Sequence, residues 1–110
     1  MVTNDELWLL DRALAPILVL AALTSGPSYP YEVCCRLRKL GFERGYSRPD
    51  LSPLFGRLAE RGYLDNRGVC VVNNRARHYY ALTESGLLAQ RAARERSIVG
   101  INILQQLAQE

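Results

Sequence analysis

The chain has 110 residues, 48% of them hydrophobic, which suffices for one folded domain with its own core and excludes a disordered protein. Its longest apolar run, Leu14–Leu23, is shorter than the roughly 18 residues of a membrane helix and contains a proline, which excludes a spanning segment. The net charge is only +3, but residues 33–77 hold ten basic and four acidic side chains, and this local excess favours a polyanionic partner.

Residues 3–24 have the pattern of a helix. Thr3 and Glu6 have the spacing of a capping box, and the helix then continues through Trp8 and the leucines that follow it. Pro16 leaves two alternatives open: it kinks this helix, or it starts a second helix that runs to about Thr24.

Residues 25–28, Ser-Gly-Pro-Ser, break the pattern, and a further helix is expected over Tyr29–Leu40. Gly41 is suited to follow its end, because glycine readily adopts the left-handed conformation. Four residues at helical spacing form the inner face of this helix: Tyr29, Val33, Leu37 and Leu40.

The stretch Tyr46–Leu64 predicts the next helix, and its outer face is unusual. Ser47 and Asp50 have capping-box spacing, and the inner face consists of Leu51, Leu54, Phe55 and Leu58. The opposite face holds Pro49, Ser52, Pro53, Gly56 and Glu60. A proline inside a helix costs roughly 3 kcal/mol and a glycine about 1 kcal/mol relative to alanine. Such exceptions on one exposed face favour a functional surface; the alternative is that Pro53 lies in a distorted first turn and that Gly56 has no role.

After Gly62, two β-rich runs, Val69–Val72 and Arg77–Leu82, flank Asn73–Ala76 and predict a hairpin with a polar, cationic tip. Two interpretations remain. The arginines of the tip reach a minor groove or a phosphate, or the tip is an ordinary solvated turn. The pair of helices before the hairpin favours the first interpretation.

Thr83 is expected to cap a last helix, whose final part is too apolar for a lone surface helix. One small domain lacks the surface to bury both this helix and the first one, so we expect it to pair with a second copy. The alternative is a helix that folds back on its own domain. The expected dimer contacts are Trp8, Leu88, Ile98, Ile101, Leu104 and Leu107. Trp8 either packs there or lines a ligand pocket.

The remaining residues point away from catalysis. Cys34, Cys35 and Cys70 have no metal-ligand spacing, so we expect buried or idle thiols in a reducing compartment in preference to a redox site. Three acidic residues precede the first basic one, the reverse of a signal peptide, so we expect a cytoplasmic protein. His78 has no acidic or thiol partner at ligand spacing and is expected to pack. With no phosphate loop, paired acids or nucleophile–base set, we expect neither an enzyme nor a cofactor.

The order helix, helix, helix, hairpin, helix predicts a mainly α protein with a small β-hairpin, an α+β winged helix-turn-helix with N- and C-terminal dimerisation helices. We expect residues 1–86 to form the DNA-binding domain, including the N-terminal helix, and residues 87–110 to form the C-terminal dimerisation helix.

Three segments together resemble the PadR family of bacterial winged-helix transcriptional regulators: Ile17–Val33, Leu51–Leu64 and Arg77–Gly86. The resemblance covers about residues 17–86. It implies a homodimer that binds a palindromic operator, usually as a repressor. Some members of the family release DNA when a small aromatic compound binds near the dimer interface, so the resemblance also implies a possible effector of this kind.

The resemblance also implies which residues meet DNA. Ser28 and Tyr29 fall at the start of the helix that crosses the DNA backbone. The residues on the recognition helix are Ser47, Arg48, Asp50, Ser52 and Arg57. The wing carries Asn74, Arg75 and Arg77. Of these, the arginines are expected to anchor phosphates, and Ser47, Asp50 and Ser52 are expected to read bases. Two alternatives remain for Asp50: it accepts a hydrogen bond from a cytosine amine, or it merely repels phosphate.

The chain departs from the family pattern on the recognition helix. Members commonly read Gly-Thr-Leu-Tyr-Pro at Pro49–Pro53, so Asp50 and Ser52 replace the usual threonine and tyrosine. Gly56 stands where a basic residue is common, and Ala81 where a charged one is. A second function therefore stays open, a winged-helix adapter that has lost DNA binding and docks a protein on this helix face.

Overall fold

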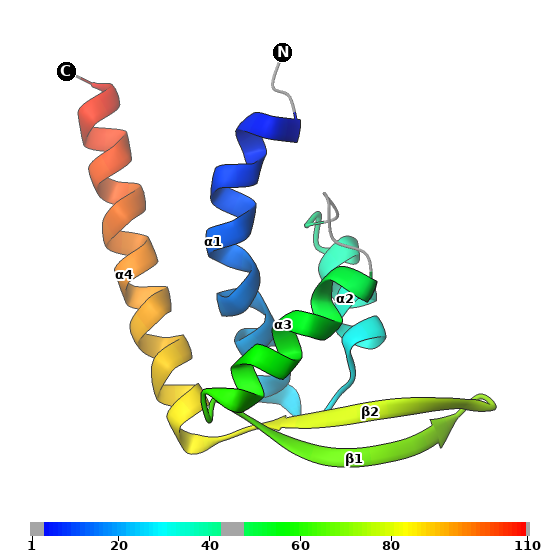
Figure 1. The fold of residues 1–110 in the computed structure, drawn as a ribbon. Helices are drawn as coiled ribbons and strands as arrows, with labels where there is room; N and C mark the ends of the chain where they lie inside the picture. The colour runs from blue at the N-terminus through cyan, green and yellow to red at the C-terminus, as the bar shows by residue number, and fades with distance from the viewer. Residues whose placement is uncertain (1–3, 43–47, 110) are drawn as a thin grey trace.

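In a computed structural model, the chain is described over residues 4–42 and 48–109, with side chains over 12–42 and 51–109 (Figure 1). In chain order the elements are α1 (Asn4–Ala22), the short 3-10 helix η1 (Leu23–Ser25), α2 (Pro30–Lys39), α3 (Arg48–Glu60), β1 (Leu64–Val72), β2 (Arg75–Leu82) and α4 (Glu84–Ala108). The expected mainly helical fold with one β-hairpin is confirmed. The expected caps Thr3 and Ser47 lie outside the described residues.

α1 runs through Pro16 as one helix, so the alternative of a second helix starting at this proline is wrong. Residues on both sides of it pack into the core, since Ala15 and Val19 are buried, and this packing offsets the missing amide. The helix ends at Ala22, whose carbonyl oxygen accepts a hydrogen bond from Arg36 Nη1 at 2.9 Å. α2 is therefore tied to the end of α1.

The core lies where α1, α2 and α3 meet the base of the hairpin. Phe55 of α3 is fully buried, and its ring contacts that of Tyr80 with centroids 5.3 Å apart. The expected inner faces of the helices are confirmed for the buried residues Val33, Leu37, Leu51, Leu54, Phe55 and Leu58. Leu40 is an exception, because it follows the end of α2 and is 84% exposed.

Pro53 lies inside α3, beyond its first turn, so the alternative of a distorted first turn is wrong. Ser52 and Pro53 are exposed, as expected for the outer face. α3 ends at Glu60, and Gly62 follows in the left-handed region with φ of 82°. This conformation turns the chain into β1.

The hairpin is longer and its turn tighter than expected. β1 begins at Leu64, and the turn consists of Asn73 and Asn74 alone, so the expected four-residue tip is corrected. Both asparagines have positive φ, 50° and 64°, which fits the two-residue turn that matches strand twist. A register shift between Asn66 and Gly68 interrupts the antiparallel pairing.

The start of α4 is joined to the chain between α3 and β1. The Thr83 cap is confirmed, because its hydroxyl oxygen accepts a hydrogen bond from the Gly86 amide at 3.0 Å. Thr83 and Ser85 also contact the carbonyl oxygen of Gly62, with their hydroxyls donating at 2.7 and 3.0 Å. These bonds set the direction in which α4 leaves the hairpin.

α4 rises beside α1, and the start of α1 and the end of α4 both lie away from the hairpin (Figure 1). The expected apolar residues on α4 are exposed, with Ile101 at 53% and Leu104 at 67%. The others are Leu88, Ile98, Val99, Ile103 and Leu107. Over the described residues, no helix is both long and apolar enough to cross a bilayer.

Candidate nucleic-acid interface

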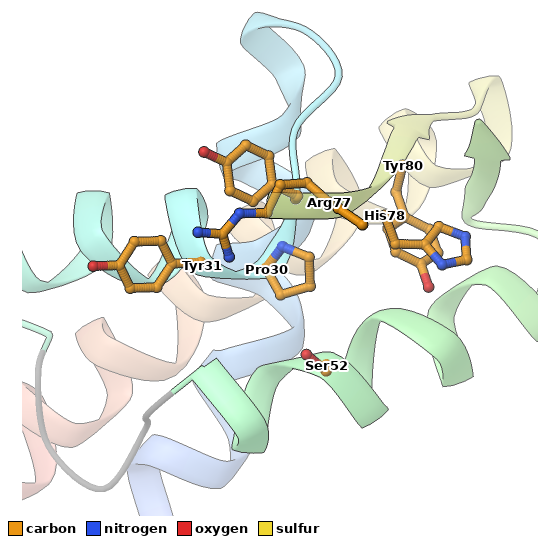
Figure 2. Close-up of a pocket in the computed structure, with 8 residues that line it drawn as sticks. Pro30, Tyr31, Ser52, Arg77, His78 and Tyr80 are labelled. Atoms are coloured by element: carbon orange, nitrogen blue, oxygen red, sulfur yellow. The ribbon is translucent and has the colours of Figure 1, made fainter. Parts of the chain in front are cut away.

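A cleft of about 320 Å³ separates the start of α2, the outer side of α3 and the inner part of β2 (Figure 2). We call it the wing cleft; its lining residues are Tyr29, Pro30, Tyr31, Ser52, Ala76, Arg77, His78 and Tyr80. Three residues expected at DNA, Tyr29, Ser52 and Arg77, are thus brought to one surface from three elements. Each comes from an element that a winged helix applies to DNA.

A short backbone pairing holds the cleft together. The Ser28 amide donates to Tyr80 O at 3.0 Å, and the Tyr80 amide donates to Ser28 O at 2.8 Å. Ser28 is 1% exposed, and its hydroxyl donates to the carboxylate of Glu32. Its side chain is therefore buried and does not present a hydroxyl at the surface, although Ser28 is among the residues expected at DNA.

The guanidinium of Arg77 lies between two tyrosine rings. Its Cζ is 5.1 Å from the ring centroid of Tyr29 and 5.0 Å from that of Tyr31. Each such contact contributes about 0.5–1 kcal/mol when exposed and about 2 kcal/mol when desolvated. The Nε of Arg77 is buried and has no hydrogen-bond partner. The arginine is therefore held from both sides, with its Nε turned inward.

Successive residues of β2 point to opposite faces, so His78 lies away from the tyrosine pair (Figure 2). Its ring stacks on Tyr80 with centroids 4.9 Å apart, and its Nε2 is hydrogen-bonded to Asn66 Oδ1. The same oxygen accepts from the Gly68 amide at 2.9 Å. These contacts support the expected packing role of His78 and fix the wing beside the register shift.

Tyr79 lies on the face of β2 shared with Arg77, and its ring centroid is 5.1 Å from that of Tyr29. Desolvation raises the pKa of Tyr79, and the nearby Tyr29 and Glu32 raise it further. These surroundings favour the neutral form of its hydroxyl over the phenolate.

Arg57 does not join the wing cleft. It lines a second cleft of about 340 Å³ on the other side of α3, together with Arg61. We call this the inner cleft; its other lining residues are Pro16, Ile17, Leu20, Leu54, Leu58, Tyr63, Ala89 and Ala93. Its walls come from α1, α3, α4 and the segment between α3 and β1, and they are largely apolar.

The remaining expected site residues are separate from both clefts or are not described. Asn74 lies in the turn between β1 and β2, Arg75 is the first residue of β2, and both are exposed. Arg48 and Asp50 lie in the first turn of α3, but their side chains are outside the described residues, as are those of Trp8 and Ser47. Of the cysteines, Cys34 is buried and Cys70 is exposed. No group of three metal-ligating side chains occurs within the described part of the chain.

The sequence does not predict that the rings of Tyr29 and Tyr31 both contact Arg77. The family resemblance implies a DNA contact for Tyr29 but not for Tyr31, which is 41% exposed beside Arg77. The available signal was the sequence Tyr-Pro-Tyr at the first turn of a helix, where an outward aromatic side chain is unusual.

Residues 19–95 match the model of the transcriptional regulator PadR-like family. No curated protein sequence gives a match. A PadR family transcriptional regulator from Eggerthella lenta has a similar structure, with a TM-score of 0.83 and 26% identity over 94% of this chain and 89% of that one. A PadR-like transcriptional regulator from Bacillus cereus gives a TM-score of 0.76 at 20% identity, over 90% of this chain and 95% of its own.

The family model spans more than half of the chain, including α2, α3 and the whole hairpin. The winged-helix arrangement expected from the order of elements is therefore confirmed, and with it the resemblance from which the site residues were inferred. The chain belongs to the PadR-like family of transcriptional regulators.

Proposed function

We propose that the chain is a sequence-specific DNA-binding repressor that acts as a homodimer on a palindromic operator in the cytoplasm. The observation that carries this proposal is the wing cleft, where Tyr29, Ser52 and Arg77 lie on one surface. A ligand that contacts all three must reach α2, α3 and the wing together, as duplex DNA does on a winged helix.

Charge supports the same partner. The excess of basic residues lies in residues 33–77, which span most of α2, all of α3 and β1, and the start of β2. Arg75 and Arg77 are the wing residues that we expect at phosphates, while Ser52 on α3 is placed to meet base edges. Phosphate contacts then supply affinity, and α3 supplies the sequence preference.

The exposed apolar residues of α4 support a dimer. Ile98, Ile101 and Leu104 are each more than half exposed in a single copy, which is an unfavourable surface unless a partner covers it. A second copy of α4, with help from α1, is the partner we propose, and residues 87–110 are then the dimerisation segment. Two-fold symmetry of the dimer requires two inverted half-sites in the operator.

The test is binding to the DNA upstream of the chain's own gene, measured by gel shift and by fluorescence anisotropy against a shuffled sequence. We expect a tighter complex with the upstream DNA, loss of affinity with added salt, and a footprint of two inverted half-sites. Absence of any complex at low salt would contradict the proposal.

The alternative is an adapter that docks a protein on the outer face of α3. It is favoured by Pro53 and Gly56 on that face and by Arg57, which lines the inner cleft. A protein captured by the wild-type chain and lost on Pro53→Glu, together with no gel shift, would support this alternative.

The resemblance implies a small aromatic effector in some members, and we propose the inner cleft as its place in this chain. The cleft is apolar and carries two arginines, so an aromatic carboxylate suits it. Addition of 2-naphthoate is expected to weaken operator binding by the wild type. Ala93→Leu, which fills the cleft from α4, is expected to remove the response while leaving operator binding intact.

A further inference from the structure

The two tyrosines at the start of α2 hold one arginine of the wing, although the two elements are far apart in the sequence. We propose that Tyr29 and Tyr31 are positioning residues that fix the guanidinium of Arg77 as a preformed clamp for a single DNA phosphate. This inference rests on the proposed function, because the ligand of the clamp is the DNA backbone.

The geometry limits what Arg77 can do. Both ring centroids lie about equally far from its Cζ, at 5.1 and 5.0 Å, so the guanidinium is restrained from two directions. Its Nε is buried without a hydrogen-bond partner, which leaves the two terminal nitrogens as the donors for an external ligand. A planar pair of donors matches the oxygens of a phosphate.

No acidic side chain occupies that position among the described residues. The neighbouring Glu32 carboxylate accepts a hydrogen bond from the buried Ser28, and Asp65 pairs with Arg67 at 3.1 Å on β1. The positive charge of Arg77 is therefore kept in the wing cleft without an ion-pair partner in the described part of the chain. A half-buried cation without such a partner is unfavourable unless a ligand supplies the negative charge.

Preorganisation explains why two rings are used. A freely rotating arginine side chain loses conformational entropy when it binds a phosphate. If two rings already hold the side chain, this entropy is lost when the protein folds and no longer opposes binding. Tyr31 is 41% exposed, so its ring does not serve the core in the way that Phe55 does. The ring of Tyr29 is in turn held by Tyr79. The clamp is thus supported from both α2 and β2.

The first test needs no DNA. In the nuclear magnetic resonance spectrum of the full-length chain, the Nε–H signal of Arg77 is expected to exchange slowly with water and to be shifted by the ring currents. Tyr31→Phe keeps the ring and should preserve the signal, whereas Tyr31→Leu should return it to the position of a solvated arginine. A solvated signal in the wild type would overturn the clamp.

The second test measures operator affinity against salt for Tyr31→Phe, Tyr31→Leu, Arg77→Met and the double variant Tyr31→Leu/Arg77→Met. Tyr31→Phe is expected to match the wild type, and Tyr31→Leu to bind about five- to tenfold more weakly. Arg77→Met should reduce the slope of log affinity against log salt by about 0.9, the value for one phosphate. In the double variant, Tyr31→Leu should cause no further loss.

Matched variants keep these outcomes decisive. Arg67→Met removes a basic residue of β1 that pairs with Asp65 and lies outside the wing cleft, so it should leave affinity nearly unchanged. Tyr31→Met provides a second ring-free variant if Tyr31→Leu lowers thermal stability. Equal losses from Tyr31→Phe and Tyr31→Leu, or independent losses from Tyr31→Leu and Arg77→Met, would overturn the clamp. If the wild type binds no DNA, the proposed function fails, while the spectral test still decides whether Arg77 is held.

Discussion

The backbone of Tyr63 lies against Gly86 so closely that a β-carbon at position 86 would come within 2.1 Å of the Tyr63 carbonyl oxygen. That oxygen cannot move aside freely, because the Thr83 amide donates to it at 3.2 Å. We predict that Gly86→Ala forces α4 away from the start of β1 and lowers the free energy of unfolding by about 1–3 kcal/mol. Urea denaturation measures this change.

Gly56→Ala is the matched control for this prediction. It also adds one β-carbon to a helical glycine, but nothing lies within 4 Å of that position. Helix propensity alone then applies, and stability should rise by about 0.5–1 kcal/mol. If both substitutions destabilised the protein equally, the close approach of the Tyr63 carbonyl oxygen would not be the cause of the effect of Gly86→Ala.

A second prediction concerns the junction between α1 and α2. Arg36 Nη1 donates to the Ala22 carbonyl at 2.9 Å, so a positive charge sits at the C-terminal end of the α1 dipole. Arg36→Met should lower the free energy of unfolding by about 1–2 kcal/mol, because a charge-assisted bond to a helix end is lost. Arg38→Met, on the exposed side of the same helix, should change stability by less than about 0.5 kcal/mol. Thermal denaturation of the two variants gives the comparison, and similar losses from both would argue against a cap.

Local patterns predicted the elements of this fold well, but not the meeting of distant side chains. The spacing of Leu51, Leu54, Phe55 and Leu58 was enough to give α3 its buried face. Arg57 was expected at DNA, yet it lines the inner cleft, because α1 and α4 both approach that side of α3. A helix projection shows which residues share a face but does not show which element will cover it.

The hairpin shows the same limit. The start of β1, Leu-Asp-Asn-Arg, lacks the alternation of a strand, and only its pairing with β2 makes it one. The clamp on Arg77 depends on this pairing and on the backbone bonds between Ser28 and Tyr80, all of which join distant parts of the chain. Candidate DNA residues could therefore be named from the sequence, but the grouping of Tyr29, Ser52 and Arg77 around one cleft could not.

The wing tip offers a prediction about sequence preference. Arg75 is exposed at the far end of the hairpin, next to the turn, and we propose that it contacts a phosphate and not the bases that we expect α3 to meet. Arg75→Ala should weaken binding to operator and shuffled DNA by the same factor and reduce the salt slope by about 0.9. Anisotropy titrations at several salt concentrations measure both quantities. A selective loss on the operator would mean that Arg75 reads sequence.

The last prediction concerns the dimer. Ile101 is 53% exposed near the middle of the apolar part of α4, and a charge placed there would have to be buried if a second copy covers this face. Ile101→Glu should therefore shift the chain from dimer to monomer in sedimentation experiments and weaken binding to a two-half-site operator far more than binding to one half-site. Asn102→Glu places the same charge on the adjacent exposed residue and should leave the dimer intact. If the wild-type chain is a monomer, the proposal that α4 is a dimerisation helix is wrong. A dimer that tolerates Ile101→Glu would place the interface on another face.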